Sequence, residues 1–392
     1  MKLSSRPPLH LTYCLNIHPG ETWAENAAAV RDHALRVRRT VAPDRAFGLG
    51  LRLSRRAAQE LGDPAALAAF RDFLAANDLY VFTINGFPYG PFHGTAVKQD
   101  VYRPDWRSAA RRDYTIGLID ILAALLPEGV PGSISTVPVA YRPWIRGTRD
   151  LRQAARMLGQ TAAHAAKVRR DTGADICVAL EPEPDCYVER TGEAIDFLAR
   201  ALPDGAEVAG ETLRRHVGVC LDTAHAAVAF EDLGASLEAL ASAQVRVGKI
   251  QLSAALRLRP TAAALRRLGD FADAVYLHQV KLRRADGQIE SFPDLPEAIA
   301  AGRHADAARA ELRVHFHVPL FFTEAGGLGS TAAMLDEGFW RRIASPSSAP
   351  TEHLEIETYT FDVLPDALRA ADVAESIRRE YEWVLARAMA SV

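Results

Sequence analysis

The sequence predicts a (β/α)8 barrel in which all 392 residues form one domain. The first observation is that eight short apolar runs, typical of buried strands, alternate with longer helical runs rich in Ala, Leu and Arg. This alternation favours parallel strands joined by helical crossovers. The second observation is that no GxGxxG motif follows the first apolar run, which weakens the rival prediction of a doubly wound, dinucleotide-binding sheet.

The expected strands are short and evenly apolar, as strands buried on both faces should be. Two helix starts carry clear capping signals: Ser54 follows the second strand, and Asp63 precedes Pro64 at a first helical turn. Helices are expected over 23–39, 106–126 and 150–170, from about Thr191, and after Pro365. The expected strands are 10–17, 47–53, 79–84, 132–137, 176–180, 217–221, 247–252 and 354–360.

One connection is far longer than a single crossover helix needs. It lies between the seventh and eighth strands, and it contains two further β-like runs, 275–282 and 312–322. We interpret residues 254–350 as an insertion over the carboxyl-terminal face of the barrel that belongs to the same domain. The Ser- and Pro-rich stretch 345–351 is its expected exit linker.

Composition excludes several classes of partner. The net charge of −3 gives no general attraction to nucleic acid or to an anionic membrane. No apolar run approaches membrane-spanning length, and no signal peptide is evident. The four cysteines form no CxxC pair, which argues against a structural zinc site and favours buried free thiols. We therefore expect a cytoplasmic protein that acts on a small molecule.

Polar side chains follow the later strands where each should end. Glu181 terminates the fifth strand, and Asp222 terminates the sixth, with His225 three residues later. Gln251 lies at the end of the seventh strand, and Glu355 and Glu357 share one face of the eighth. Carboxylates gathered at one barrel end would repel each other unless a cation neutralises them. The pattern therefore predicts a divalent metal site, with Mn²⁺, Mg²⁺ or Zn²⁺ as candidates.

Each of these residues also has a purely structural interpretation. Glu181 could stabilise the start of the next helix, Asp222 could be an N-cap, and Glu355 or Glu357 could pair with an arginine. We favour the site interpretation for Glu181 and Asp222. Of the two glutamates we favour Glu357, because it lies nearer the carboxyl end of its strand.

Several other residues are candidates for ligand or substrate contacts. His315 and His317 form an HxH pair at strand spacing within the insertion, and His317 is a candidate metal ligand. The loop after the third strand is rich in aromatic residues, Gly and Pro, and suits either a pocket wall or a packed Ω-loop on the barrel rim. The candidate substrate contacts are His18, Arg52, Asn85, His93, His225 and His278.

The segments LEPEP around Glu181 and LDTAH around Asp222, with a glutamate on the last strand, resemble the xylose-isomerase-like barrel superfamily. This resemblance implies that Glu181 and Glu357 both bind the metal and move a substrate proton. It also implies that Asp222 is a metal ligand and that His225 contacts substrate. A histidine ligand is usual on the seventh strand, and here Gln251 takes its place.

Nearly the whole chain resembles the EboE family of metabolite traffic proteins. The stretches that support this are LTYCLNIHPGETW, FGLGLRLS, YVFTINGFPYGPFHG, VKQDVYRPDW, GSISTVP, LEPEPDC and LHQVKLR. The resemblance implies a role in moving a secondary-metabolite precursor, and other proteins of the same gene cluster as partners.

Two hypotheses about function follow. The paired glutamates favour a metal-dependent isomerase or epimerase that acts on a small hydroxy-carbonyl or polyol-like metabolite. The substitution of histidine by Gln251 favours a protein that binds and hands over such a metabolite without turnover. A third possibility, cleavage of damaged DNA, requires more histidine ligands and a basic groove, and the net charge argues against it.

Overall fold

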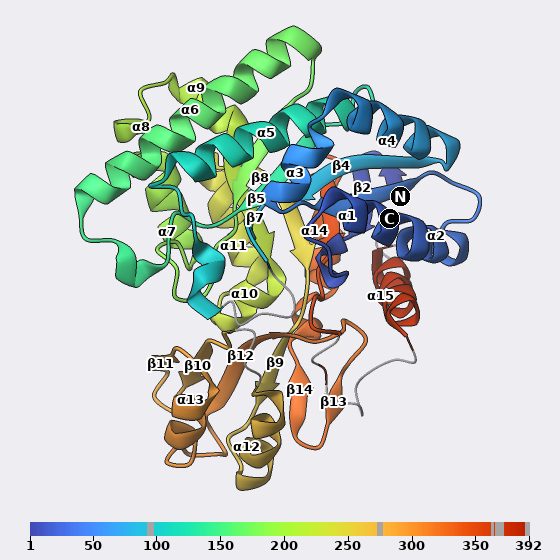
Figure 1. Ribbon diagram of the computed structural model, residues 1–392. Helices are drawn as coiled ribbons and strands as arrows, with labels where there is room; N and C mark the ends of the chain where they lie inside the picture. The colour runs from blue at the N-terminus through green and yellow to red at the C-terminus, as the bar shows by residue number, and fades with distance from the viewer. Residues whose placement is uncertain (92–97, 273–276, 362–363, 365–371, 389–392) are drawn as a thin grey trace.

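The computed structural model describes the chain apart from residues 92–97, 273–276, 362–363, 365–371 and 389–392. It confirms the predicted barrel: eight strands pair in parallel in the order β2-β15-β8-β7-β6-β5-β4-β3 (Figure 1). A bridge between Cys14 and Gly50 joins the two ends of this sheet, and β1 (Lys2–Ser5) adds to β2 in antiparallel fashion. The barrel strands are β2 (Pro8–Tyr13), β3 (Phe47–Arg52), β4 (Leu79–Asn85), β5 (Gly132–Thr136), β6 (Ile176–Leu180), β7 (Val217–Asp222), β8 (Val247–Leu252) and β15 (His353–Ile356).

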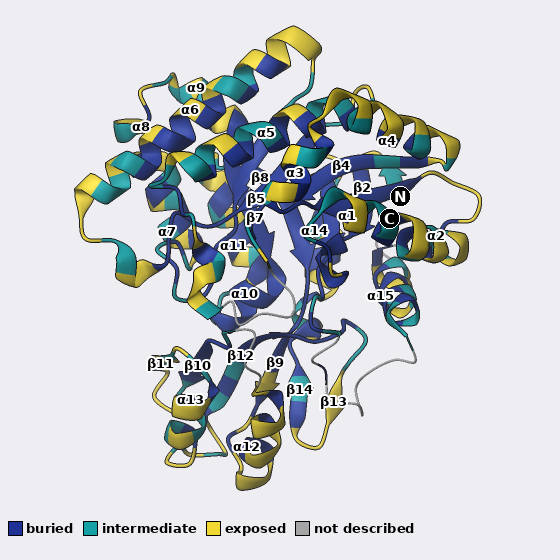
Figure 2. Ribbon diagram, in the orientation of Figure 1, coloured by how far each residue is buried: buried dark blue, intermediate teal, exposed yellow. Residues whose placement is uncertain are grey.

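The barrel strands are buried on both faces (Figure 2). One face points into the barrel and the other is covered by helices, so the runs are continuously apolar. Two strands end earlier than predicted. The first ends at Tyr13 because the chain then bridges to Gly50 and turns through Leu15–Ile17. The last ends at Ile356 because the chain turns toward the insertion, where Thr360 donates to the carbonyl oxygen of His317.

The helices form the outer layer of the barrel. Both predicted caps are present: Ser54 accepts from the amide of Ala57, and Asp63 accepts from the amides of Ala65 and Ala66. The helix expected over 23–39 is interrupted by a π-helical turn at Val30–Ala34. The helices are α1 (Trp23–Ala29), α2 (Leu35–Val41), α3 (Arg55–Leu61), α4 (Pro64–Ala76), α5 (Ala109–Leu125), α6 (Thr148–Thr172), α7 (Thr191–Asp196), α8 (Leu202–Gly205), α9 (Gly210–His216), α10 (Thr223–Val228), α11 (Leu233–Ser242) and α15 (Val373–Ala388).

The long connection forms a second sheet (Figure 1). Its six strands are antiparallel, in the order β11-β10-β12-β9-β14-β13. Their bounds are β9 (Ala255–Leu258), β10 (Val280–Arg283), β11 (Ile289–Phe292), β12 (Glu311–His317), β13 (Glu324–Ala325) and β14 (Leu328–Ser330). Helices α12 (Ala262–Leu268), α13 (Leu295–Gly302) and α14 (Glu337–Ile343) belong to the same segment.

The second sheet follows the barrel directly in the chain. Its first strand, β9, begins three residues after Leu252, the last residue of β8, and pairs with β12. One cluster of buried hydrophobic side chains includes Leu252 and Leu354 of the barrel together with Leu256 and Phe316 of the insertion. That barrel and insertion form one domain stays a prediction, which this shared core supports.

Two further expectations concern cysteines and membranes. All four cysteines are buried and free. No helix in the described part of the chain combines the length and apolar character needed to cross a membrane.

Candidate metal centre

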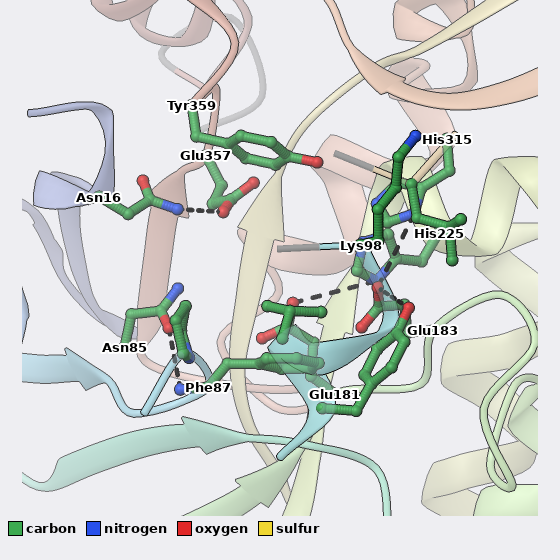
Figure 3. A pocket seen from close by; sticks show the side chains of 14 residues that line it. Asn16, Asn85, Phe87, Lys98, Glu181, Glu183, His225, His315, Glu357 and Tyr359 are labelled. Atoms are coloured by element: carbon green, nitrogen blue, oxygen red, sulfur yellow. Dashed lines mark hydrogen bonds and ion pairs between the residues drawn. The ribbon is translucent and has the colours of Figure 1, made fainter. Parts of the chain in front are cut away.

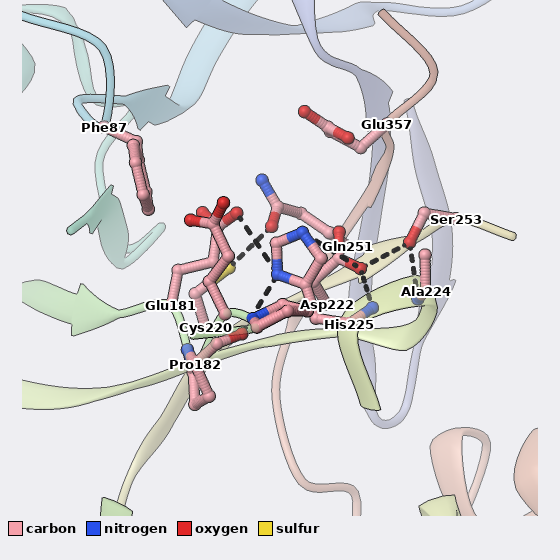
Figure 4. Close-up of polar contacts among 12 residues, drawn as sticks. Phe87, Glu181, Pro182, Cys220, Asp222, Ala224, His225, Gln251, Ser253 and Glu357 are labelled. Atoms are coloured by element: carbon pink, nitrogen blue, oxygen red, sulfur yellow. Dashed lines mark hydrogen bonds and ion pairs between the residues drawn. The ribbon is translucent and has the colours of Figure 1, made fainter. Parts of the chain in front are cut away.

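Three carboxylates lie at the carboxyl ends of barrel strands. Glu181 directly follows β6, Asp222 ends β7, and Glu357 directly follows β15 (Figure 4). Their residues are 5%, 1% and 4% exposed. Three buried carboxylates in one place need protons or a cation to offset the lost hydration of their charges.

Three histidines join these carboxylates. His225 lies on α10, whose first turn is fixed because Asp222 Oδ1 accepts from the His225 amide at 2.8 Å. His315 and His317 lie two residues apart on β12, and this spacing directs both to the same side. Candidate ligand atoms lie within 4.8 Å of one another in three overlapping sets: His225, His315, His317; Glu181, Asp222, His225; and Asp222, His317, Glu357. We call these six residues the metal cluster.

The three imidazoles of the metal cluster share one pattern of hydrogen bonding. His225 Nδ1 lies 3.0 Å from the Pro182 carbonyl oxygen, and His317 Nδ1 lies 2.9 Å from the Glu357 carbonyl oxygen. His315 Nδ1 lies 2.8 Å from Oε1 of Gln279. Because these oxygens accept, each Nδ1 carries a proton, and in a neutral imidazole Nε2 then has the free electron pair that a metal ion needs. Metal-binding histidines are commonly oriented by outer acceptors in this way.

Several atoms of the metal cluster have no other partner. Asp222 Oδ2, His315 Nε2 and His317 Nε2 are buried and make no hydrogen bond to the described residues. Buried polar atoms without partners are costly, so their presence in one cluster fits a cation that would bind them.

The same crowding shifts the protonation equilibria. Burial, with Asp222 and Glu357 nearby, raises the pKa of Glu181 well above its usual value. Burial lowers the pKa of His225 and, together with the neighbouring histidines, that of His315. Burial also opposes the charge on His317, but Glu357 and Asp222 outweigh it and raise the pKa of His317 to about 10. Without a metal, protons therefore partly neutralise the cluster.

The structure distinguishes the two glutamates of the last strand. Glu355 is fully buried within the barrel and forms an ion pair with Lys249. Glu357 lies 2.6 Å from His317 Nδ1 through Oε2 and accepts from Asn16 Nδ2 at 2.6 Å through Oε1. Only Glu357 belongs to the metal cluster.

Gln251 lies near the carboxyl end of β8 and is fully buried. With its amide nitrogen turned toward Glu181, it donates to the two carboxylate oxygens at 3.1 and 3.2 Å. In this orientation Gln251 contacts Glu181, and its predicted role as a metal ligand stays a prediction.

A pocket with an empty volume of about 550 Å³, part of it open to solvent, adjoins the metal cluster (Figure 3). The pocket is lined by four residues of the metal cluster, Glu181, His225, His315 and Glu357. Glu183, which does not belong to the cluster, lines it as well. Glu183 accepts from the Tyr102 hydroxyl at 2.9 Å, and burial raises its pKa to about 8. The other lining residues are Asn16, Asn85, Phe87, Pro88, Lys98, Val101, Tyr102, Leu277 and Tyr359.

The predicted substrate contacts lie in different places. Asn85 and His225 line the pocket. His18 contacts the Tyr13 hydroxyl and stacks on His33, while Arg52 donates to Glu21 and to the carbonyl oxygens of Gly20 and Gly90. His278 lies 3.5 Å from Asp294 and stacks on Phe316. His18, Arg52 and His278 are thus not among the lining residues, and His93 lies outside the described residues.

Sequence reasoning did not assign roles to four residues of the site. His315 was visible as half of the HxH pair, and Glu183 as the second glutamate of LEPEP. Asn16 was visible as a polar residue at the end of the first strand, beside His18, whereas Tyr102 gave no signal. Their contacts with Glu357 and Glu183 could not be predicted, because they join segments far apart in the chain.

Comparison with known proteins supports the fold assignment. Neither protein-family models nor curated proteins match this sequence. Among solved structures, the chain is similar to the IOLI protein with a bound zinc atom, with a TM-score of 0.51 and 10% identity over 98% of this chain and 99% of that one. It is similar to L-ribulose 3-epimerase, with a TM-score of 0.51 and 11% identity over 98% and 95% of the two chains.

A third solved structure is a xylose isomerase-like TIM-barrel protein from Mycobacterium smegmatis in complex with magnesium. Its TM-score is 0.51 at 12% identity, over 98% of both chains. At this identity the likeness shows the fold alone: a xylose-isomerase-like (β/α)8 barrel.

Proposed function

We propose that this chain binds a divalent metal ion at the metal cluster and catalyses isomerisation or epimerisation of a small polyhydroxy carbonyl compound. The observation that supports this most directly is the set of three histidines with Nδ1 held by acceptors and Nε2 left for a ligand, next to three buried carboxylates. We assign His225, His317 and Asp222 as the central ligands. His315, Glu181 and Glu357 lie around these ligands, and they do not all bind the ion at once, because substrate oxygens need open positions on it.

The donor set also suggests which ion binds. Three imidazoles favour a first-row transition ion such as Zn²⁺ or Mn²⁺ over Mg²⁺, which prefers oxygen ligands. When bound, such an ion would polarise the carbonyl and hydroxyl oxygens of a substrate.

The protein supplies the groups that move the proton. Glu181 and Glu357 both face the pocket and come from different strands, so one can take a proton from carbon while the other returns it. Return to the opposite face of the same carbon is epimerisation, and return to the neighbouring carbon is isomerisation. Gln251 and Asn16 hold the two carboxylates by donating to them. Phe87, which lines the pocket, helps to exclude water.

The pocket favours an unphosphorylated substrate. Among its described lining residues, Lys98 is the one lysine or arginine, and Asp294 pairs with it at 2.9 Å. Three glutamates line the same space. The sequences of residues 92–97 and 273–276, which adjoin lining residues, contain no lysine or arginine. A phosphate group would therefore meet little positive charge beyond the metal itself.

The decisive experiment follows hydrogen exchange. The protein, loaded with Zn²⁺ or Mn²⁺, is incubated with unphosphorylated ketoses and related hydroxyketones in D2O, and the products are analysed by mass spectrometry. We expect carbon-bound deuterium with the native chain and none with Glu181→Gln or Glu357→Gln. Glu352→Gln is the matched control, because Glu352 immediately precedes the opposite end of β15. Metal binding and tight sugar binding without exchange would contradict an enzyme and favour the metabolite-handover protein.

We also propose, on the sequence motifs alone, that the protein belongs to the EboE family and acts in the cytoplasm in metabolite traffic. Partners from the same gene cluster would then receive or supply its ligand. Co-purification of the tagged chain with those gene products tests this, and its failure would leave the proposed chemistry untouched.

A further inference from the structure

The insertion reaches the metal cluster through a fully buried amide, Gln279, which immediately precedes β10. Its Oε1 lies 2.8 Å from His315 Nδ1, and its Nε2 donates to the Pro184 carbonyl oxygen at 3.1 Å and to the Tyr102 hydroxyl at 2.7 Å. Every hydrogen-bonding group of this amide thus has a partner. The three partners come from different parts of the chain.

These contacts fix which way the amide points. A carbonyl oxygen can only accept, so the atom that faces Pro184 must be the nitrogen. The oxygen must then face His315, and His315 Nδ1 must be the donor. A neutral imidazole with its proton on Nδ1 leaves Nε2 free, and this Nε2 is buried with no other hydrogen bond to the described residues.

The same amide joins the insertion to the barrel segment that carries Glu181 and Glu183. The Tyr102 hydroxyl, which accepts from Gln279, donates to Glu183 at 2.9 Å. Two residues farther along β10, the buried Lys281 pairs with Asp185 at 2.9 Å and with Glu189 at 2.5 Å. The loop after β6 is therefore held at two adjacent positions, Pro184 by Gln279 and Asp185 by Lys281.

We propose that Gln279 is a positioning residue for the metal centre. It holds His315 in the tautomer whose Nε2 can bind a metal, and so makes the insertion part of the centre. This proposal rests on the proposed function where it concerns metal binding, but the tautomer of His315 can be measured without any metal. Loss of an outer partner of a ligand typically weakens metal binding by about 10- to 100-fold.

The test uses two substitutions that separate positioning from simple packing. Gln279→Met removes the acceptor and both donors, whereas Gln279→Glu keeps an acceptor for His315 Nδ1 and loses the donors to Pro184 and Tyr102. If Gln279 acts as an acceptor for His315, Q279M should weaken Zn²⁺ binding by about 10- to 100-fold, and Q279E should restore most of it. Gln288→Met, on the exposed turn between β10 and β11, is the matched control.

Long-range proton–nitrogen NMR spectra of metal-free protein with labelled histidine give the second readout. We expect the Nδ1-protonated form of His315 in the native chain and in Q279E, and a growing Nε2-protonated population in Q279M. Equal losses of Zn²⁺ affinity in Q279M and Q279E, or an unchanged His315 tautomer in Q279M, would overturn the proposal. If the native chain bound no metal, the proposed function would fail, while the tautomers would still decide the role of Gln279.

Discussion

The barrel and the insertion contribute to the metal cluster in chemically different ways. The barrel supplies the carboxylates Glu181, Asp222 and Glu357 from the carboxyl ends of parallel strands, together with His225 from the following helix. The insertion supplies only imidazoles, His315 and His317, from one antiparallel strand. A barrel with carboxylates at its mouth can bind many divalent ions, and the added imidazoles narrow that choice toward transition metals.

The two regions also differ in how they handle buried charge. Inside the barrel, Glu355 forms an ion pair with Lys249. Gly50 has no side chain, and the Glu355 carboxylate occupies the space where its Cβ would be. At the mouth, no lysine or arginine of the described chain pairs with Glu181, Asp222 or Glu357. There the partners of the carboxylates are histidines, and such a group of carboxylates and imidazoles could hold a metal ion.

The largest expected effect concerns the charge pair inside the barrel. Lys249→Met should reduce the free energy of unfolding by about 3–5 kcal/mol, because Glu355 would remain buried without its partner. Because we propose one domain, fluorescence and circular dichroism should report a single shared transition in urea. The double variant Lys249→Met, Glu355→Gln should recover much of the loss. Two separate transitions would show instead that the barrel and the insertion fold independently.

The next prediction concerns a joint between the two regions. Glu380 on α15 accepts from the Leu320 amide at 3.1 Å and from the Thr358 hydroxyl at 2.7 Å, and burial raises its pKa from 4.5 to about 7. The folded state thus binds this proton more tightly than the unfolded state does. Its contribution to stability is fully present below pH 4.5 and falls as pH rises toward 7.

Glu380→Gln should remove this dependence. At 1.36 kcal/mol for each unit of pKa, the native chain should lose about 3 kcal/mol relative to the variant between pH 4.5 and 8. Urea unfolding of both proteins at pH 5 and pH 8 measures the difference. Equal pH dependence in the two proteins would show that Glu380 does not titrate in this range.

A third prediction concerns the barrel carboxylate that is shared by two of the three ligand sets, Asp222. Asp222→Asn keeps an oxygen that accepts from the His225 amide and from Ser253, so α10 should remain capped. Zn²⁺ affinity should fall by more than about 100-fold, beyond the effect expected for an outer partner. Titration calorimetry checks this, and Ser253→Ala, which removes an outer partner of Asp222, should show the smaller loss of about 10- to 100-fold. Unchanged affinity and stoichiometry would contradict the assignment of Asp222.

The smallest expected effect tests the contribution of the insertion to metal choice. His315→Gln replaces an imidazole by an amide of similar length, and should lower the preference for Zn²⁺ over Mg²⁺ by about tenfold. Competition between the two ions, followed by elemental analysis, measures the preference. His304→Gln is the control, since His304 is an exposed histidine of the same insertion. An equal loss of both ions would mean that His315 stabilises the site without selecting the ion.

The sequence itself determined the barrel fold and the carboxylates that lie at the carboxyl ends of its strands. Continuously apolar runs alternating with helices have few stable arrangements, and a polar residue at the end of such a run must lie at the edge of the sheet. The positions of Glu181, Asp222 and Glu357 along their strands are therefore enough to place all three at one end of the barrel. Asp222 is the N-cap of α10, as one of the two alternatives predicted, and it also lies in the metal cluster, where its role as a ligand stays a prediction.

Only the tertiary structure decided which polar groups meet. Alternation along β15 places Glu355 and Glu357 on the same face. The two lie at different depths in the barrel, however, so Glu355 pairs with Lys249 and Glu357 pairs with His317. A lysine inside the apolar strand Val247–Leu252 was the available signal for that pairing. The contacts of His315 with Gln279, and of Glu357 with Asn16, join residues up to 341 positions apart. Local pattern fixes the direction of a side chain from its own strand, whereas its partner depends on how distant strands pack together.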